Sequence, residues 1–320
     1  MAHMIETMAF AGAVPWHGLG VPVPPDIGVD EMLVRAGLDW EVEKRPLHMH
    51  HDGRAVVVPD QFALVRATDA RVLSVVGRAY EPVQNREALE FFREFVDAGD
   101  MTLETAGSLG DGKRVWALAS IRDGFELAGG DEVRGYLLFS SPHVRNESLV
   151  VQFTPIRVVC ANTLAMALRG ESTGVYRHPH MAAFNAERAK EALGLARGQL
   201  SGFRDVAAFL ASRRYARDSV VRFFAEVFEP ARAANDGEPI DTLVRLPRVA
   251  RAMDALDTQP GADTRAAAGT WWGAVNAVTY LADHRLGRSA DTRLASAWYG
   301  EARQFKLRAL TRAADYARAA

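Results

Sequence analysis

The sequence has one cysteine and almost no net charge, and each scarcity excludes a class of protein. Cys160 has no second thiol to pair with, so the chain has neither an internal disulfide nor a cysteine-rich zinc site. The formal net charge is -2. Binding to nucleic acid therefore requires a local basic face, because the chain as a whole offers no excess of positive charge.

Long hydrophobic runs are also missing. No apolar stretch approaches the roughly 20 residues that a membrane-spanning helix needs. The stretch Met1–Glu6 lacks the basic and apolar regions of a signal peptide. Together with the single cysteine, these features predict a cytoplasmic protein with no membrane partner.

Motifs that hold cofactors are absent as well. The stretch Gly107–Arg114 is glycine-rich and basic, but it departs from the P-loop spacing and precedes a strand pattern instead of a helix. The chain has no Gly-x-Gly-x-x-Gly after a strand and no Gly-x-Ser-x-Gly elbow. We predict no cofactor, no metal and no catalytic residue that spacing alone identifies, and we interpret the stretch as a β-hairpin with a basic tip.

The patterns that are present change along the chain from strand to helix. They predict an α+β fold: an N-terminal antiparallel sheet meander with covering helices, followed by an all-helical C-terminal region. We expect an N-terminal arm at 1–30, in which proline and glycine prevent regular pairing, an α+β sheet domain at 31–172 and a helical domain at 173–320.

Individual elements follow from period-two and helical spacing. Hairpins are expected around Asp52-Gly53 and between 62–66 and 72–76, and a helix from Asn85 to Gly99. The expected meander strands are 102–106, 114–121, 134–140 and 148–159. The expected C-terminal helices are 182–200, 203–212, 219–229, 245–256, 264–284 and 290 to the end.

The stretch Glu147–Gly170 joins the two regions. Its first half is rich in β-branched residues and its second half in helix formers. We predict a buried strand that turns into a helix capped by Asn162 and ended by Gly170, with a linker at 171–179.

Histidines offer weaker signals for chemistry. His48 and His50 share a strand face, and His178 and His180 flank a proline in the predicted linker. Either pair needs a third ligand to hold a metal, and solvent exposure or a helix-start contact is the stronger interpretation. His143, with Arg157, is the alternative site for an enzyme of unspecified reaction.

Basic residues give the better signal. Arg157 interrupts an apolar strand, so its guanidinium must pair with a carboxylate or face a ligand. Arginines near aromatic residues are typical of single-strand binding, although solvated helix faces over an aromatic core explain the same pattern. The candidate nucleic-acid-binding residues are Lys113, Arg114, Arg134, Arg145, Arg157, Arg213, Arg214, Arg217, Arg303, Lys306 and Arg308.

Four dispersed motifs resemble the DUF932 family of phage/plasmid-like proteins of unknown function. They are Val14–Gly20, Glu104–Leu109, Arg157–Leu164 and Thr270–Thr279. Related proteins often carry Gln where this chain has Ala161. The resemblance implies a mobile-element setting and assigns no catalytic residue.

The expected order of helix, meander and helix is also similar, without a shared motif, to the Rad52/Red-beta type of single-strand annealing proteins. Our leading hypothesis is a phage-type protein, a homo-oligomer, that binds or anneals single-stranded DNA in recombination. The alternatives are an enzyme with a site around Arg157 and His143 and a structural or oligomerising interaction protein.

Overall fold

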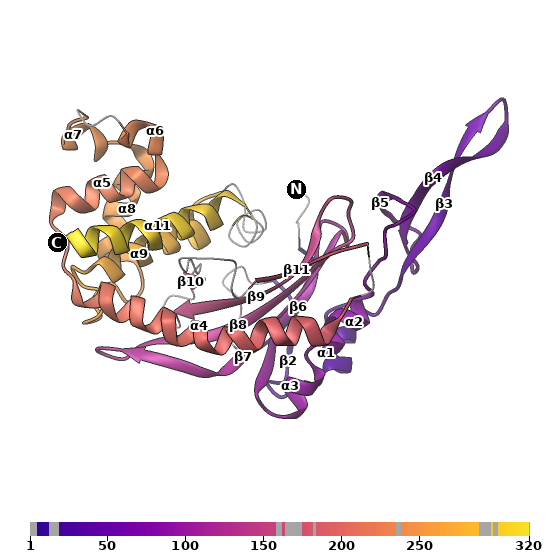
Figure 1. Ribbon diagram of the computed structural model, residues 1–320, viewed down its shortest axis with the longest axis horizontal. Helices are drawn as coiled ribbons and strands as arrows, with labels where there is room; N and C mark the ends of the chain where they lie inside the picture. Colours follow the sequence, from indigo (N-terminus) through magenta and orange to yellow (C-terminus); the bar gives the residue numbers. More distant parts are fainter. Residues whose placement is uncertain are drawn as a thin grey trace. The chain divides into compact units, whose positions relative to one another are not determined.

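The computed structural model describes residues 5–12, 19–157, 162–163, 175–181, 184–234, 238–287, 296 and 300–319. It confirms an α+β fold with strands in the N-terminal half and helices mostly in the C-terminal half (Figure 1). The chain forms two compact units. The first consists of Met1–Arg122, Tyr136–Phe153 and Gly174–Ala196, and the second of Asp123–Gly135, Thr154–Thr173 and Arg197–Ala320. The boundaries predicted at 31 and 173 rest on composition and stay predictions.

A mainly antiparallel sheet carries most of the strands. Its order is β10-β9-β8-β7-β6-β1-β2, and β11 also pairs with β9. The strands are β1 (Ile5–Ala11), β2 (Val21–Val23), β6 (Met101–Leu109), β7 (Arg114–Leu127), β8 (Asp131–Pro142), β9 (Ser148–Arg157), β10 (Asn162–Thr163) and β11 (Val175–Pro179). The predicted meander is thus confirmed, and each of its strands starts or ends within a few residues of the predicted position.

A smaller antiparallel sheet has the order β3-β4-β5. It consists of β3 (Val42–His51), β4 (Arg54–Arg66) and β5 (Val72–Gly77). Asp52 and Gly53 form the predicted turn with φ of 48° and 75°, the conformation that suits a two-residue hairpin. Beside these strands, the first unit contains α1 (Val29–Arg35), α2 (Asn85–Glu90) and α3 (Arg93–Asp97). The single helix predicted from Asn85 to Gly99 is therefore interrupted, at the buried pair Phe91 and Phe92.

The base of the small sheet is held by a buried arginine. Arg66 donates to both carboxylate oxygens of Glu6 at 2.8 and 3.0 Å and pairs with Asp69 at 2.7 Å. Its guanidinium also lies 5.4 Å from the centre of the Trp40 ring. Glu6 belongs to β1 and Arg66 to β4, so this pairing links the two sheets of the first unit.

The second unit has an aromatic core. Phe203, Phe223, Phe224, Trp271 and Trp272 are all fully buried in it. The helices are α4 (Ala186–Ser212, whose first turns belong to the first unit), α5 (Arg217–Phe228), α6 (Pro230–Ala233), α7 (Ile240–Leu243), α8 (Pro247–Thr258), α9 (Trp271–Tyr280), the π-helical turn Leu281–Arg285 and α11 (Glu301–Ala319). None of the described helices is long and apolar enough to cross a membrane.

Three predictions about elements were wrong. The N-terminal arm does pair regularly: β1 contains neither proline nor glycine, and Pro22 lies in the edge strand β2, where a missing N–H is tolerated. Asn162-Thr163 does not begin a helix, because it pairs back onto Ile156-Arg157 as β10, and the helix predicted to follow these two residues lies outside the described part of the chain. The predicted linker contains β11, which pairs with Ser148–Gln152. Cys160 and Gly170 lie outside the described residues.

Two helix boundaries also differ from the prediction. The helices expected at 182–200 and 203–212 are one helix, α4, because Gly202 alone does not stop it. The helix expected from Thr264 starts only at Trp271, where the Thr270 hydroxyl accepts a hydrogen bond from the Gly273 N–H at 3.2 Å. Capping by Thr270 satisfies one of the unpaired donors of the first turn.

Candidate nucleic-acid interface

The junction between α4 and α5 brings three of the predicted arginines together. α4 ends at Ser212 and α5 begins at Arg217, and the chain between them runs against the residues that precede α9. Arg214 forms a β-bridge with Thr270, and the backbone N–H of Trp271 donates to the backbone carbonyl oxygen of Arg213 at 2.9 Å. The backbone that carries the arginines is therefore fixed on a buried helix.

Arg213, Arg214 and Arg217 constitute what we call the arginine cluster. All three side chains are exposed, and none makes an ion pair with another residue of the described chain. Between 213 and 218 the only acid is Asp218, so three positive charges face one negative charge. Such an arrangement leaves guanidinium groups available to an anionic ligand.

Two aromatic rings accompany the cluster. The Arg213 guanidinium lies 5.4 Å from the centre of the Phe209 ring. Tyr215 packs on Trp271 with ring centres 5.8 Å apart, and burial raises the pKa of its phenol. Phe209 and Tyr215 are half-buried, whereas Trp271 belongs to the core. Stacking on a ligand is thus open only to the first two rings.

Four other predicted residues have protein partners. Arg114 pairs with Glu147 and donates to the Ser140 hydroxyl, and Arg134 pairs with Glu132 at 2.7 Å. Lys306 pairs with Asp283 at 2.8 Å with both side chains buried, and Arg308 donates to the carbonyl oxygen of Val227. These cations already have a structural role.

The remaining predicted residues are spread over the chain. Lys113 and Arg145 are exposed in the first unit. The backbone N–H of His143 donates to the backbone carbonyl oxygen of Lys113 at 2.8 Å. Arg303 is half-buried in α11, where it interacts with another group. Arg157 lies on β9, and its side chain is outside the described part of the structure.

The alternative site around His143 is closed to solvent. His143 is fully buried, and its Nε2 lies 2.9 Å from Asn85 Oδ1. Burial, with a smaller effect of His180, lowers the pKa of His143 to about 3. The ring is therefore neutral at physiological pH, and it has the surroundings of a core histidine.

The four other histidines singled out in the sequence do not gather at a metal site. His48 and His50 are exposed on β3, whereas His178 and His180 are buried at the end of β11. His180 stacks on Tyr80 at 4.8 Å, and burial lowers the pKa of its imidazole. Within the described residues, no group of three or more His, Cys, Asp or Glu side chains is placed to hold a metal ion.

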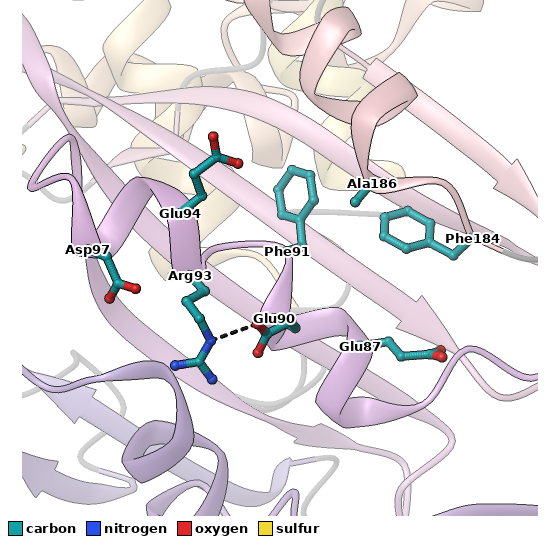
Figure 2. Close-up of a pocket in the computed structure, with 8 residues that line it drawn as sticks. All are labelled: Glu87, Glu90, Phe91, Arg93, Glu94, Asp97, Phe184 and Ala186. Carbon is teal, nitrogen blue, oxygen red and sulfur yellow. Dashed lines mark hydrogen bonds and ion pairs between the residues drawn. The ribbon is translucent and has the colours of Figure 1, made fainter.

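An acidic groove in the first unit was not predicted (Figure 2). It has a volume of about 490 Å³ and is lined by Glu87, Glu90, Phe91, Arg93, Glu94, Asp97, Phe184 and Ala186. Arg93 donates to Glu90 at 2.7 Å. The four acids are three or four residues apart in the sequence, and all four line this groove although α2 and α3 are separate helices. The acidic side chains would repel phosphate. The arginine cluster is therefore the stronger candidate for an anion-binding site.

Comparison with known families identifies the class of the protein. A family model described as a domain of unknown function, DUF932, matches residues 72–298. The match spans most of the chain, so the protein belongs to the DUF932 family, and the resemblance seen in the sequence motifs is confirmed. No curated protein and no solved structure shows significant similarity to the chain. The analogy to annealing proteins stays a prediction.

Proposed function

We propose that this DUF932 protein binds single-stranded nucleic acid, with single-stranded DNA of a phage or plasmid as the expected ligand. The observation that supports the proposal is the arginine cluster: three exposed guanidiniums in five residues, without an acidic partner among the described residues, on a fixed backbone.

The chemistry of the cluster suits a phosphate backbone. A guanidinium donates two parallel hydrogen bonds to phosphate oxygens and keeps its charge at every physiological pH. Phe209 and Tyr215 add half-exposed rings beside it, on which an unpaired base can stack. A duplex hides its bases, so the combination favours a single strand.

The proposal is tested by fluorescence anisotropy with a labelled oligothymidylate at low salt. The test variant carries Arg213→Gln, Arg214→Gln and Arg217→Gln. We expect at least about tenfold weaker binding, because three phosphate contacts are lost.

The matched control removes the same charge elsewhere in the second unit. Arg134, Arg232 and Arg318 each pair with a nearby acid, so the variant with Gln at all three should bind within about threefold of wild type. Absence of binding by the wild-type protein at low salt, or equal weakening in both variants, contradicts the proposal.

A further inference from the structure

The outer part of the β3–β4 hairpin is a ribbon that no third strand covers. β5 pairs with β4 only between Gln61 and Val65, whereas His48–His51 pairs with Arg54–Val57 alone. We call residues 47–58 the distal ribbon. Figure 1 shows the hairpin extending beyond β5, away from the helices of the first unit. Within the described chain, both edges of the ribbon present backbone N–H and C=O groups with no strand partner.

The distal ribbon is a discrete element. The β3–β4 register shifts between Pro46 and His48, and Asp60 opposite this shift has φ of 56°. Pro46 and Pro59 therefore mark its base, and the tight Asp52-Gly53 turn closes its tip. Irregular pairing at the base separates the ribbon from the part of the hairpin that Arg66 anchors.

Apolar side chains are exposed on both faces of the ribbon. Directly paired residues share a face. Met49 and Val56 pair on one face with 50% and 44% of their surface exposed, and Val57 is 54% exposed on the other, opposite His48. An isolated two-stranded hairpin is marginally stable in water, so strands added along an edge would stabilise the ribbon by pairing its backbone and by placing neighbouring side chains beside these apolar ones on each face.

The charge of the ribbon indicates which partner that is. Between residues 47 and 58 one acid, Asp52, cancels one base, Arg54, and there is no lysine. A neutral ribbon gives a polyanion little attraction, and it gives a second copy no repulsion. Exposed strand edges normally carry lysine or proline that prevents self-pairing, and Ala55–Val58 has neither.

We propose that the distal ribbon pairs edge to edge with the same ribbon of a second copy, through antiparallel pairing of Ala55–Val58. Four uncharged residues then face four uncharged residues, three of them β-branched on each side. A two-fold contact requires such a self-complementary surface. The pairing joins two copies into a four-stranded ribbon and does not depend on nucleic-acid binding.

The test is sedimentation equilibrium of the full chain, without nucleic acid, from low to high micromolar concentration. Wild type is expected to form a dimer. In this pairing Val57 faces Val56 of the second copy, so Val57→Lys places a charged side chain beside an apolar one at two points of the contact and should raise the dissociation constant at least about tenfold. The matched control is Val72→Lys on β5, where valine is 55% exposed in the same sheet, and it should leave the constant unchanged.

A cross-linking measurement keeps the proposal testable if the lysine variant misfolds. In a Cys160→Ala background, a mixture of Val56→Cys and Val57→Cys chains should give a covalent dimer with a short bismaleimide, because these two positions face each other on one face of the paired ribbons. A mixture of Val57→Cys and Val72→Cys chains should not. A wild-type protein that is monomeric throughout, equal effects of the two lysine substitutions, or equal cross-linking of the two mixtures would overturn the pairing.

Discussion

Arg213 and Lys306 belong to the same unit but have opposite surroundings. The Arg213 side chain is exposed and lies on Phe209, whereas only 2% of the Lys306 side chain is exposed, and its ammonium pairs with Asp283. The sequence identifies both as basic residues near aromatic ones. It does not give their partners, because Asp283 lies 23 residues away along the chain. Of the predicted site, the sequence could therefore supply the residue types but not their availability.

Removing one member of the buried pair should destabilise the second unit. Lys306→Met leaves Asp283 charged and buried without its main partner, so we expect a loss of about 3–5 kcal/mol of unfolding free energy. Arg318→Met, which breaks the half-exposed pair with Asp315, should cost under about 1 kcal/mol. Urea denaturation of both variants measures the difference. Equal losses of unfolding free energy in the two variants would show that burial of the Lys306–Asp283 pair does not make it more important for stability than the exposed pair.

His143 should make the stability of the protein depend on pH. The folded state keeps the ring neutral, with a pKa of about 3, while the unfolded chain takes up a proton below about 6.5. The stability that the folded protein gains from keeping His143 neutral is therefore fully present above pH 6.5 and is lost as the pH falls toward 3. Between pH 6.5 and pH 5, protonation of His143 in the unfolded chain lowers the free energy of unfolding by about 2 kcal/mol.

Urea denaturation at pH 7 and pH 5 tests this dependence. His143→Gln keeps a donor for Asn85 and cannot titrate in this range, so the fall in stability between the two pH values should shrink by about 2 kcal/mol. His48→Gln changes an exposed ring and should keep the wild-type fall. The same fall in the His143 variant would mean that other groups cause it.

The long strands and helices were predicted well from the sequence, whereas the segments that connect them were not. β7 and β8 contain the continuous runs 115–119 and 136–142, which are buried on both faces, and an uninterrupted apolar run bounded by turn residues predicts such a strand. β10 and β11 depend instead on pairing with β9, which is a tertiary contact. Asn162-Thr163 is a good helix cap by itself, and the competing pairing with Ile156-Arg157 prevails.

Two helical glycines should respond in opposite directions to alanine. At Gly273 in α9 an added Cβ would overlap the Ala267 carbonyl oxygen, so Gly273→Ala should destabilise by about 1–3 kcal/mol. At Gly202 in α4 nothing lies within 4 Å, so Gly202→Ala should stabilise by about 0.5–1 kcal/mol. Thermal unfolding of the two variants provides the comparison. A stabilising Gly273→Ala would contradict the close approach of α9 to Ala267.

The two units of the molecule are proposed to have different functions. In the first unit, the distal ribbon is proposed to pair with a second copy. In the second unit, the arginine cluster is proposed to hold a phosphate backbone. Family membership supports neither task, because the DUF932 description names no function. Both proposals combine charge, which the sequence gives, with the exposure of side chains and strand edges, which a single sequence does not reveal.

The salt dependence of oligothymidylate binding shows whether Arg213, Arg214 and Arg217 contact phosphates. Each phosphate contact to a single strand contributes about 0.7 to the slope of log affinity against log salt concentration. Replacing Arg213, Arg214 and Arg217 by Gln should therefore reduce the slope by about 2, while the control with Gln at Arg134, Arg232 and Arg318 keeps the wild-type slope. A cluster variant with the wild-type slope would contradict the claim that these three arginines bind the phosphate backbone.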